Sequence, residues 1–261
     1  MTADDRLQTI KQIETMARDA WPAAQRDHLN GWQLRFTYGI TRRANSVWPN
    51  DTDSETSLDE KLNDVELFYA VYEAPARFQV SPAVYPPDLD IVLAMRGYQR
   101  SAETAVQTAK LSGVLADTGP ILPEPGFAVE VSEDFNLAWF QTYCDIEQYG
   151  ARAVAVRRDI IQRIGTRTGF ALARLGDEPV AVGLGVVSGD WLGIFSMATH
   201  AGMRRRGAGI SILHALAGWA QSYGVRQAYL QVMLINPAAL ALYRRCGFTT
   251  LYHYHYREKL L

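Results

Sequence analysis

The chain has 261 residues, of which 48% are hydrophobic and 21% charged, and this composition excludes a disordered or fibrous protein. Its formal net charge of −2 at pH 7 gives no support to binding of nucleic acid or of a membrane surface, so any anion site must be local. Two cysteines, Cys144 and Cys246, are too few for a disulfide framework and lack metal-ligand spacing, which fits a reducing, cytoplasmic location. No stretch approaches the roughly 20 apolar residues of a membrane span.

Hydrophobic periodicity predicts helices and strands on both sides of a stretch rich in proline and glycine. In the first part we expect helices at about 4–20, 57–73 and 88–96, and strands WQLRFTYGI, RFQV and SAETAVQTAKL. In the second part we expect helices at about 135–147, 151–164, 206–222 and 237–245, and strands GFALARL, PVAVGLGVV, WLGIFSMAT, AYLQVML and TTLYHYHYR. The pattern predicts a mixed α/β fold.

The stretch DTGPILPEPG, residues 117–126, holds three prolines and two glycines and is therefore interpreted as a linker between domains 1–116 and 127–261. The two parts are similar to each other, since ARFQV in the first matches AYLQV in the second. Each of these strands is followed by a helical segment that ends in a glycine–aromatic turn, MRGY and RCGF respectively. We infer an ancient duplication.

The stretch RRRGAG, residues 204–209, places three arginines beside two glycines at the start of a predicted helix. A helix N-terminus carries unpaired N–H groups and a partial positive charge, and glycines let the main chain approach an anion closely. The matching stretch of the first part, NDTDSETS, has carboxylates and no glycine, so we expect a pyrophosphate site in the second part only. A merely solvated helix start is the alternative.

These residues resemble the GNAT-superfamily N-acetyltransferases, whose signature Q/R-x-x-G-x-G/A is matched by Arg204, Gly207 and Gly209. A second signature of that family, an Asn followed by Tyr and then Gly-Phe, is matched by NPAALALYRRCGF from Asn236, with Tyr243 at the expected spacing. The resemblance covers about residues 127–258 and implies two tandem GNAT-like domains, each a mixed, mostly antiparallel sheet flanked by helices. The first domain is then a degenerate copy, and its WQLRFTYGITRRANSVWP resembles a stretch of one two-domain subgroup.

The resemblance implies transfer of acetyl from acetyl-CoA to a primary amine, most simply a small molecule, by direct attack in a ternary complex. It also implies that strand MAT separates from its neighbour to bind the pantetheine arm, and that Tyr243 is the general acid. Asn236 is equally a helix cap before Pro237, and Tyr243 is equally a core aromatic. The implied cofactor site comprises Met197, Ala198, Thr199, Arg204, Arg205, Arg206, Gly207, Ala208, Gly209, Ile210 and Asn236.

The sequence names no general base. Relatives in the family carry Glu where this chain has Gln231, and a water chain, His200 or a base from the first part remains open.

For the acceptor, Asp145 and Glu147 are candidates to attract an ammonium group and Tyr149 to stack on it, although an ordinary solvated helix face explains them equally. A polar cluster in the first part suits an acceptor with a carboxylate, or is simply a loop rich in turns; its members are Arg42, Arg43, Asn45 and Ser46.

Two other functions stay open at this point. The absence of a carboxylate at Gln231 is compatible with a non-catalytic, CoA-binding regulatory module, and a generic nucleotide-binding domain is a third candidate. The aromatic tail LYHYHYR, residues 251–257, is either a buried last strand or a contact in a homodimer.

Overall fold

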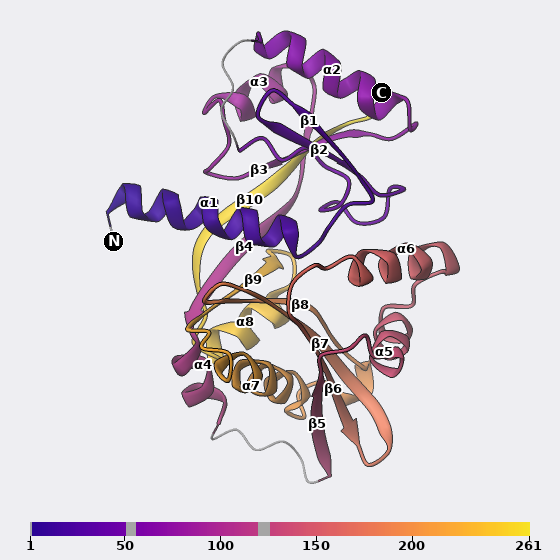
Figure 1. Ribbon diagram of the computed structural model, residues 1–261, viewed down its shortest axis with the longest axis vertical. Helices are drawn as coiled ribbons and strands as arrows, with labels where there is room; N and C mark the ends of the chain where they lie inside the picture. Colours follow the sequence, from indigo (N-terminus) through magenta and orange to yellow (C-terminus); the bar gives the residue numbers. More distant parts are fainter. Residues whose placement is uncertain (1, 51–55, 120–125) are drawn as a thin grey trace. The chain divides into compact units, whose positions relative to one another are not determined.

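The computed structural model describes residues 2–50, 56–119 and 126–261, which form a mixed α/β fold (Figure 1). The helices are α1 (Ala3–Asp19), α2 (Leu58–Ala70), α3 (Leu89–Met95), α4 (Leu111–Thr118), α5 (Leu137–Glu147), α6 (Ala151–Gln162), the 3-10 turn η1 (Ala201–Met203), α7 (Ala208–Gln221) and α8 (Pro237–Arg245). The strands are β1 (Gln25–Leu29), β2 (Trp32–Phe36), β3 (Ala76–Val80), β4 (Gln99–Lys110), β5 (Phe127–Ser132), β6 (Thr168–Leu175), β7 (Glu178–Ser188), β8 (Trp191–Thr199), β9 (Gln227–Met233) and β10 (Thr249–Lys259).

The chain folds into two compact units that are not consecutive halves of the sequence. Unit 1 contains the chain up to Ala105, a short segment at Asp159–Arg163, and the end of the chain from Tyr252. Unit 2 contains Val106–Arg158 and Ile164–Leu251, so β4 and β10 each pass from one unit to the other. The domains 1–116 and 127–261 are inferred from the linker and from an ancient duplication, and these boundaries stay a prediction. Residues 120–125 of the expected linker lie outside the described residues.

Unit 1 is built on short strands and well-capped helices. α1 and α2 each begin with a capping box, Thr2 with Asp5 and Ser57 with Glu60, in which two otherwise orphaned N–H groups are satisfied reciprocally. β1 and β2 form an antiparallel hairpin, and β3 pairs antiparallel with β10. The tyrosines of β10 at 252, 254 and 256 are buried, so the aromatic tail is a buried last strand and supports no dimer contact.

A buried carboxylate lies in the interior of unit 1. Glu14 of α1 is 1% exposed, and its two oxygens accept hydrogen bonds from Tyr252 Oη at 2.6 Å and from Gln79 Nε2 at 2.9 Å. Burial raises the pKa of Glu14, against the opposing effects of the Tyr252 hydrogen bond and of the Arg35 charge. The carboxylate therefore links α1 to β3 and β10 at the cost of desolvation.

Unit 2 contains a sheet in the order β4-β9-β8-β7-β6-β5. The pairs β5–β6, β6–β7 and β7–β8 are antiparallel and β8–β9 is parallel, which confirms a mixed, mostly antiparallel sheet for this unit. Helix α7 packs closely on it because β7 presents glycine: a Cβ on Gly183 would lie 2.4 Å from Ile212 Cγ2.

Most predicted elements are present, with three omissions. The hairpin strand β1, QRDHL, is almost entirely exposed and therefore lacks hydrophobic alternation. The short helix α4 was predicted as the end of a strand and the start of the linker, and β5 was not predicted. Residues 51–55 of the stretch compared with RRRGAG lie outside the described residues.

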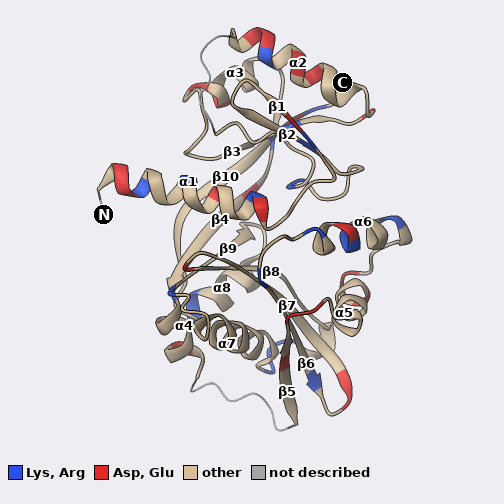
Figure 2. Cartoon of the chain, viewed as in Figure 1, with Lys and Arg blue, Asp and Glu red and all other residues tan. Residues whose placement is uncertain are grey.

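Basic and acidic side chains are interspersed along both units (Figure 2), in keeping with the formal net charge of −2. Any strong preference for an anion must therefore come from local geometry. Among the described residues, no helix is both long and apolar enough to cross a membrane.

Candidate functional site

Two strands of unit 2 separate close to the arginine–glycine loop. β8 and β9 pair only from Trp191↔Gln227 to Ile194↔Leu230, although both strands continue beyond those residues. The later part of β8 stays paired with β7 as far as Ala181↔Thr199. The separation leaves main-chain groups of 195–199 and 231–233 without a ladder between them. The predicted departure of the MAT segment from its neighbour is therefore present.

A bulge in β8 accompanies this separation. Ser196 has a φ of 49°, in the left-handed region, and the β7–β8 register shifts between Val182 and Leu184. Bulges bend a strand and redirect its side chains, and they are frequent next to active sites. After the bulge, Met197 and Thr199 are half-buried and Ala198 is buried, as expected for alternating directions along a strand.

Helix α7 begins at Ala208, the fifth residue of the RRRGAG stretch and two residues after the predicted start at about 206. Gly207 is its N-cap, with a φ of 93° that only glycine adopts without strain, and it provides no side-chain cap. The first main-chain bond of the helix runs from Ser211 N to Gly207 O at 3.0 Å. The N–H groups of residues 208–210 therefore have no intrahelical acceptor, as an anion site at a helix start requires.

Gly209 has a packing role in addition to the one expected. A Cβ at this position would lie 3.2 Å from Leu242 Cδ2, so the missing side chain lets α7 approach α8. Ala208 and Ile210 are buried beside it.

The three arginines differ in their surroundings. Arg204 and Arg205 are exposed and form no ion pair with a described carboxylate, and Arg205 has a φ of 62°. Arg204 Nε contacts Thr199 O at 3.4 Å, which connects the loop to the end of β8. Arg206 Nη1 lies 3.0 Å from Met203 Sδ. The loop therefore presents fixed positive charge beside the open N–H groups of α7.

Asn236 is the N-cap of α8, because its Oδ1 accepts a hydrogen bond from Ala239 N at 3.1 Å. The capping role considered from the sequence is correct, and a contact with a cofactor stays a prediction.

Tyr243 lies in the last turn of α8 and is 7% exposed. Its ring meets Phe248 edge-on, with ring centroids 6.0 Å apart, and its hydroxyl makes no hydrogen bond with a described residue. Burial raises the pKa of Tyr243 to about 12, with a smaller contribution from Cys246. The phenol is therefore fully protonated at neutral pH and has an unused hydrogen-bond donor.

The structure names no general base. Gln231 is half-buried on β9, and His200, whose N donates to Val180 O at 3.0 Å, follows β8. Gln231 cannot accept a proton as a carboxylate does.

The expectation that Tyr149 offers an open face to an ammonium group is wrong for one of its faces. The Arg157 guanidinium lies 3.9 Å from the centroid of the Tyr149 ring, so this chain already supplies a cation there. Asp145 and Glu147 are exposed, and Glu147 accepts a hydrogen bond from Tyr149 Oη at 3.3 Å.

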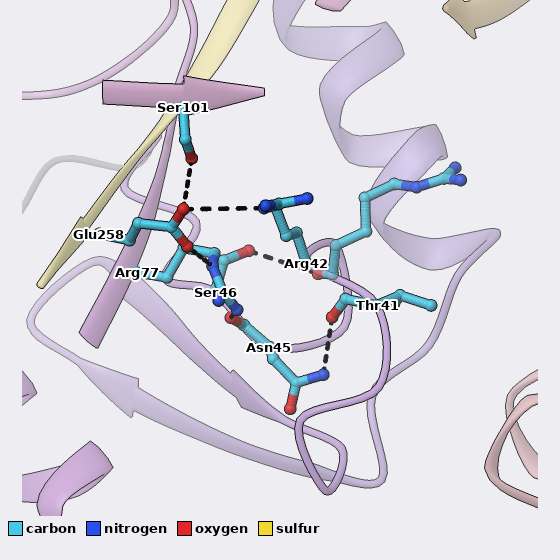
Figure 3. Close-up of polar contacts among 8 residues, drawn as sticks. Thr41, Arg42, Asn45, Ser46, Arg77, Ser101 and Glu258 are labelled. Atoms are coloured by element: carbon cyan, nitrogen blue, oxygen red, sulfur yellow. Dashed lines mark hydrogen bonds and ion pairs between the residues drawn. The ribbon is translucent and has the colours of Figure 1, made fainter. Parts of the chain in front are cut away.

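The polar cluster of the first part is largely structural. Asn45 is 3% exposed, and its amide accepts from Thr37 N and Gly39 N and donates to three main-chain carbonyls, including Thr41 O at 2.7 Å (Figure 3). Ser46 Oγ accepts from Arg35 at 2.9 Å. These two side chains hold a turn-rich loop together.

Arg42 of this loop is only loosely engaged by charge. Glu258 is bound by Arg77 at 2.8 Å and Ser101 at 2.6 Å, so the contact of Arg42 with the same carboxylate, at 3.8 Å, is secondary (Figure 3). Arg43 lies 5.0 Å from the Trp21 ring.

Sequence reasoning missed two residues of α5 and α6. Trp139 donates from Nε1 to Gly183 O at 2.9 Å, which fixes α5 on β7 opposite the bulge of β8. Arg157 sits in AVRRD of the predicted helix at about 151–164, and no local sequence signal distinguishes it from Arg158.

Known proteins resemble this chain along most of its length. A family model described as "Probable histone acetyltransferase Rv0428c C-terminal" matches residues 8–257. The Bacillus subtilis (strain 168) protein described as "Uncharacterized N-acetyltransferase YobR" is 28% identical over 255 residues, which cover 97% of this chain and 100% of that protein.

Solved structures share the fold. "GCN5-related N-acetyltransferase from Kribbella flavida" has a TM-score of 0.68 at 14% identity and covers 95% of this chain and 94% of its own. A "Tandem GNAT protein from the clavulanic acid biosynthesis pathway" has a TM-score of 0.62 at 15% identity and covers 76% of this chain and 67% of its own.

Proposed function

We propose that this chain, which belongs to the acetyltransferase family matched over residues 8–257 and so to the GNAT superfamily, transfers acetyl from acetyl-CoA to a primary amine. The observation that carries the proposal is the continuity of residues 197–210. Within this one segment, a strand separates from its parallel neighbour and leads into a helix start with open N–H groups, beside the exposed Arg204 and Arg205, which form no ion pair with a described carboxylate. A long ligand with an amide-bearing arm and a diphosphate fits such a segment.

The residues that would hold the cofactor divide by chemistry. Main-chain groups of Met197 and Thr199 would bind the amides of the pantetheine arm, in the way that a strand edge binds an added strand. The N–H groups of residues 208–210, together with Arg204 and Arg205, would bind the diphosphate. When bound, acetyl-CoA supplies a thioester whose carbonyl carbon accepts the amine and whose sulfur leaves.

Tyr243 is the proposed proton donor for the departing sulfur. A phenol with a pKa of about 12 facing a thiol of ordinary pKa near 8.5 would transfer its proton uphill by about 5 kcal/mol. The neighbouring thiol of Cys246 indicates a smaller gap, because burial raises its pKa to about 11. A sulfur enclosed in the same surroundings would meet Tyr243 with a difference of about 1.4 kcal/mol.

Orientation supplies the rest of the proposed mechanism. Direct attack needs the neutral amine and the thioester held together in one complex, which converts a bimolecular step into an intramolecular one. No side chain is assigned as the base that receives the amine proton.

A CoA-binding regulatory module is the second candidate, favoured by Gln231 at the position where relatives carry Glu. It predicts that Tyr243→Phe changes nothing measurable while CoA still binds.

The experiment is to mix the purified chain with acetyl-CoA and a panel of small amines, and to follow the free thiol that is released. Calorimetry with CoA measures binding separately. Thiol release with at least one amine supports the enzyme. CoA binding without thiol release for any amine supports the regulatory module. The absence of both CoA binding and thiol release refutes both candidates.

A further inference from the structure

The corner between α5 and α6 in unit 2 holds Tyr143, Tyr149 and Arg157, which we call the tyrosine–arginine cluster. The C-cap of α5 is Gln148, whose φ of 54° is left-handed and turns the chain sharply. The turn brings Tyr149 back onto Tyr143, with the two hydroxyls 3.2 Å apart and the rings at 75°. Arg157 of α6 then donates from Nη1 to Tyr143 Oη at 3.2 Å. Side chains from α5, from the turn after it and from α6 therefore meet at one point.

The charge of Arg157 has no counterion among the described residues. Its contacts there are a neutral hydroxyl and the face of the Tyr149 ring, and its Nε is buried without a hydrogen-bond partner. By contrast, Arg77 of unit 1, which is similarly enclosed, is paired with Glu258 at 2.8 Å. Withdrawing a guanidinium from water is unfavourable unless an anion compensates it, so an unpaired, half-buried arginine indicates that a ligand brings the anion.

The neighbouring carboxylates do not fill this role. Glu147 accepts from Tyr149 Oη and forms no ion pair with Arg157, and Asp145 is exposed on α5. Because the Tyr149 hydroxyl already donates to Glu147, the donor of the cluster that no described carboxylate engages is the Arg157 guanidinium.

The cluster is also fixed with respect to the separated strands. Trp139, anchored by its bond to Gly183 O, precedes Tyr143 by one helical turn, and their ring centroids are 5.5 Å apart. Gly183 lies between the pairs Val182↔Ala198 and Leu184↔Phe195, directly across from the β8 bulge. The cluster is thus tied through Trp139 to the residue of β7 that faces the bulge of β8.

We propose that the tyrosine–arginine cluster binds a carboxylate on the acceptor, so that the substrate is an amine that also carries a carboxylate, such as an amino acid. This proposal rests on the proposed acetyl transfer. The Arg157 guanidinium holds the carboxylate, Tyr143 and Tyr149 position that guanidinium, and the amine is directed toward the bulge of β8. The charge preference is thus opposite to the ammonium site expected on Tyr149 from the sequence.

The test compares acetylation of free amino acids with that of their carboxamides, which keep the amine and lose the negative charge. The intact chain should prefer the free acid of at least one pair. Arg157→Met should lower kcat/KM for that acid about 10- to 100-fold, the loss expected for charge-assisted hydrogen bonds, and leave the carboxamide nearly unchanged. Arg157→Lys should recover part of the preference, because it restores the charge without the planar donors.

Arg158→Met is the matched control, since Arg158 is the exposed neighbour on the same helix and its guanidinium lies 5.3 Å from the centroid of the Phe140 ring. It should leave the acid-to-amide ratio unchanged. A preference for carboxamides, or a ratio that Arg157→Met does not alter, overturns the proposal while leaving acetyl transfer intact. If no amine is acetylated, calorimetry with N-acetylated amino acids and their amides tests the carboxylate site instead. Binding of the free acid that is lost in Arg157→Met supports the site. No binding of the free acid, or binding that persists in Arg157→Met, overturns the proposal.

Discussion

Replacement of Tyr243 by phenylalanine separates chemistry from folding. The Tyr243 hydroxyl makes no hydrogen bond with a described residue, while its ring packs on Phe248 at 6.0 Å, and phenylalanine keeps that ring. The free energy of unfolding should therefore change by less than about 1 kcal/mol. CoA affinity should also be unchanged, because the proposed diphosphate contacts lie on α7.

The rate should fall, because the departing sulfur loses its proton donor. General acid catalysis contributes typically about 10²- to 10⁴-fold. The low end applies here, since a phenol with a pKa of about 12 is a weak acid even for a sulfur in surroundings that raise the Cys246 pKa to about 11. We expect kcat to drop about 100-fold with little change in KM for acetyl-CoA.

The assay is thiol release at saturating acetyl-CoA from pH 7 to 10.5, corrected for hydrolysis without enzyme. A tyrosine of ordinary pKa near 10 would be about half deprotonated at pH 10, whereas a pKa of about 12 leaves roughly 99% protonated. The wild-type kcat should therefore not fall through deprotonation of Tyr243 up to about pH 10.

Tyr223→Phe is the control, because Tyr223 is an exposed residue of the same unit whose hydroxyl bonds Glu133. It should leave kcat unchanged. A Tyr243→Phe enzyme with wild-type kcat, or a wild-type rate that already falls between pH 8 and 9, would refute the assignment.

Three further predictions follow from the geometry. Gly207→Asp should weaken CoA binding at least about tenfold by calorimetry, because it places a negative charge and a strained φ at the helix start, and unchanged affinity would contradict the diphosphate site. Gly183→Ala should lower the free energy of unfolding measured in urea by about 1–3 kcal/mol, since the new Cβ meets Ile212 Cγ2 at 2.4 Å. A free energy of unfolding within error of wild type would show that α7 shifts freely. Relative to wild type, Glu14→Gln should raise the urea midpoint more at pH 8 than at pH 5. The folded-state pKa of Glu14 is raised, so the wild-type chain has stability at low pH that it loses as the pH rises, and glutamine removes that loss. Urea midpoints with the opposite trend would show that the carboxylate is favourably ionised.

Local chemistry explains why much of the fold follows from the sequence. The glycines at 207 and 209, the Asn236–Pro237 start of α8 and the apolar run of β7 each act on neighbouring residues, so their elements are predictable. The separation of β8 from β9 was expected only through family resemblance, because it depends on pairing across the sheet.

What the sequence does not reveal depends on contacts between distant segments. Asn45 looked like part of a polar binding cluster, but its amide is consumed by main-chain groups of its own loop. No sequence signal singles out Arg157, and only the left-handed turn at Gln148 brings Tyr149 onto it. Such roles depend on where the chain folds back, which composition and periodicity do not encode.

Amide chemical shifts of isotope-labelled protein titrated with CoA would test the central claim most directly. The account predicts that the largest changes fall on Ala208, Gly209 and Ile210 at the start of α7, with a second group at 197–199 on β8. Saturable binding with unchanged amides in both segments, or changes centred elsewhere in the chain, would contradict it.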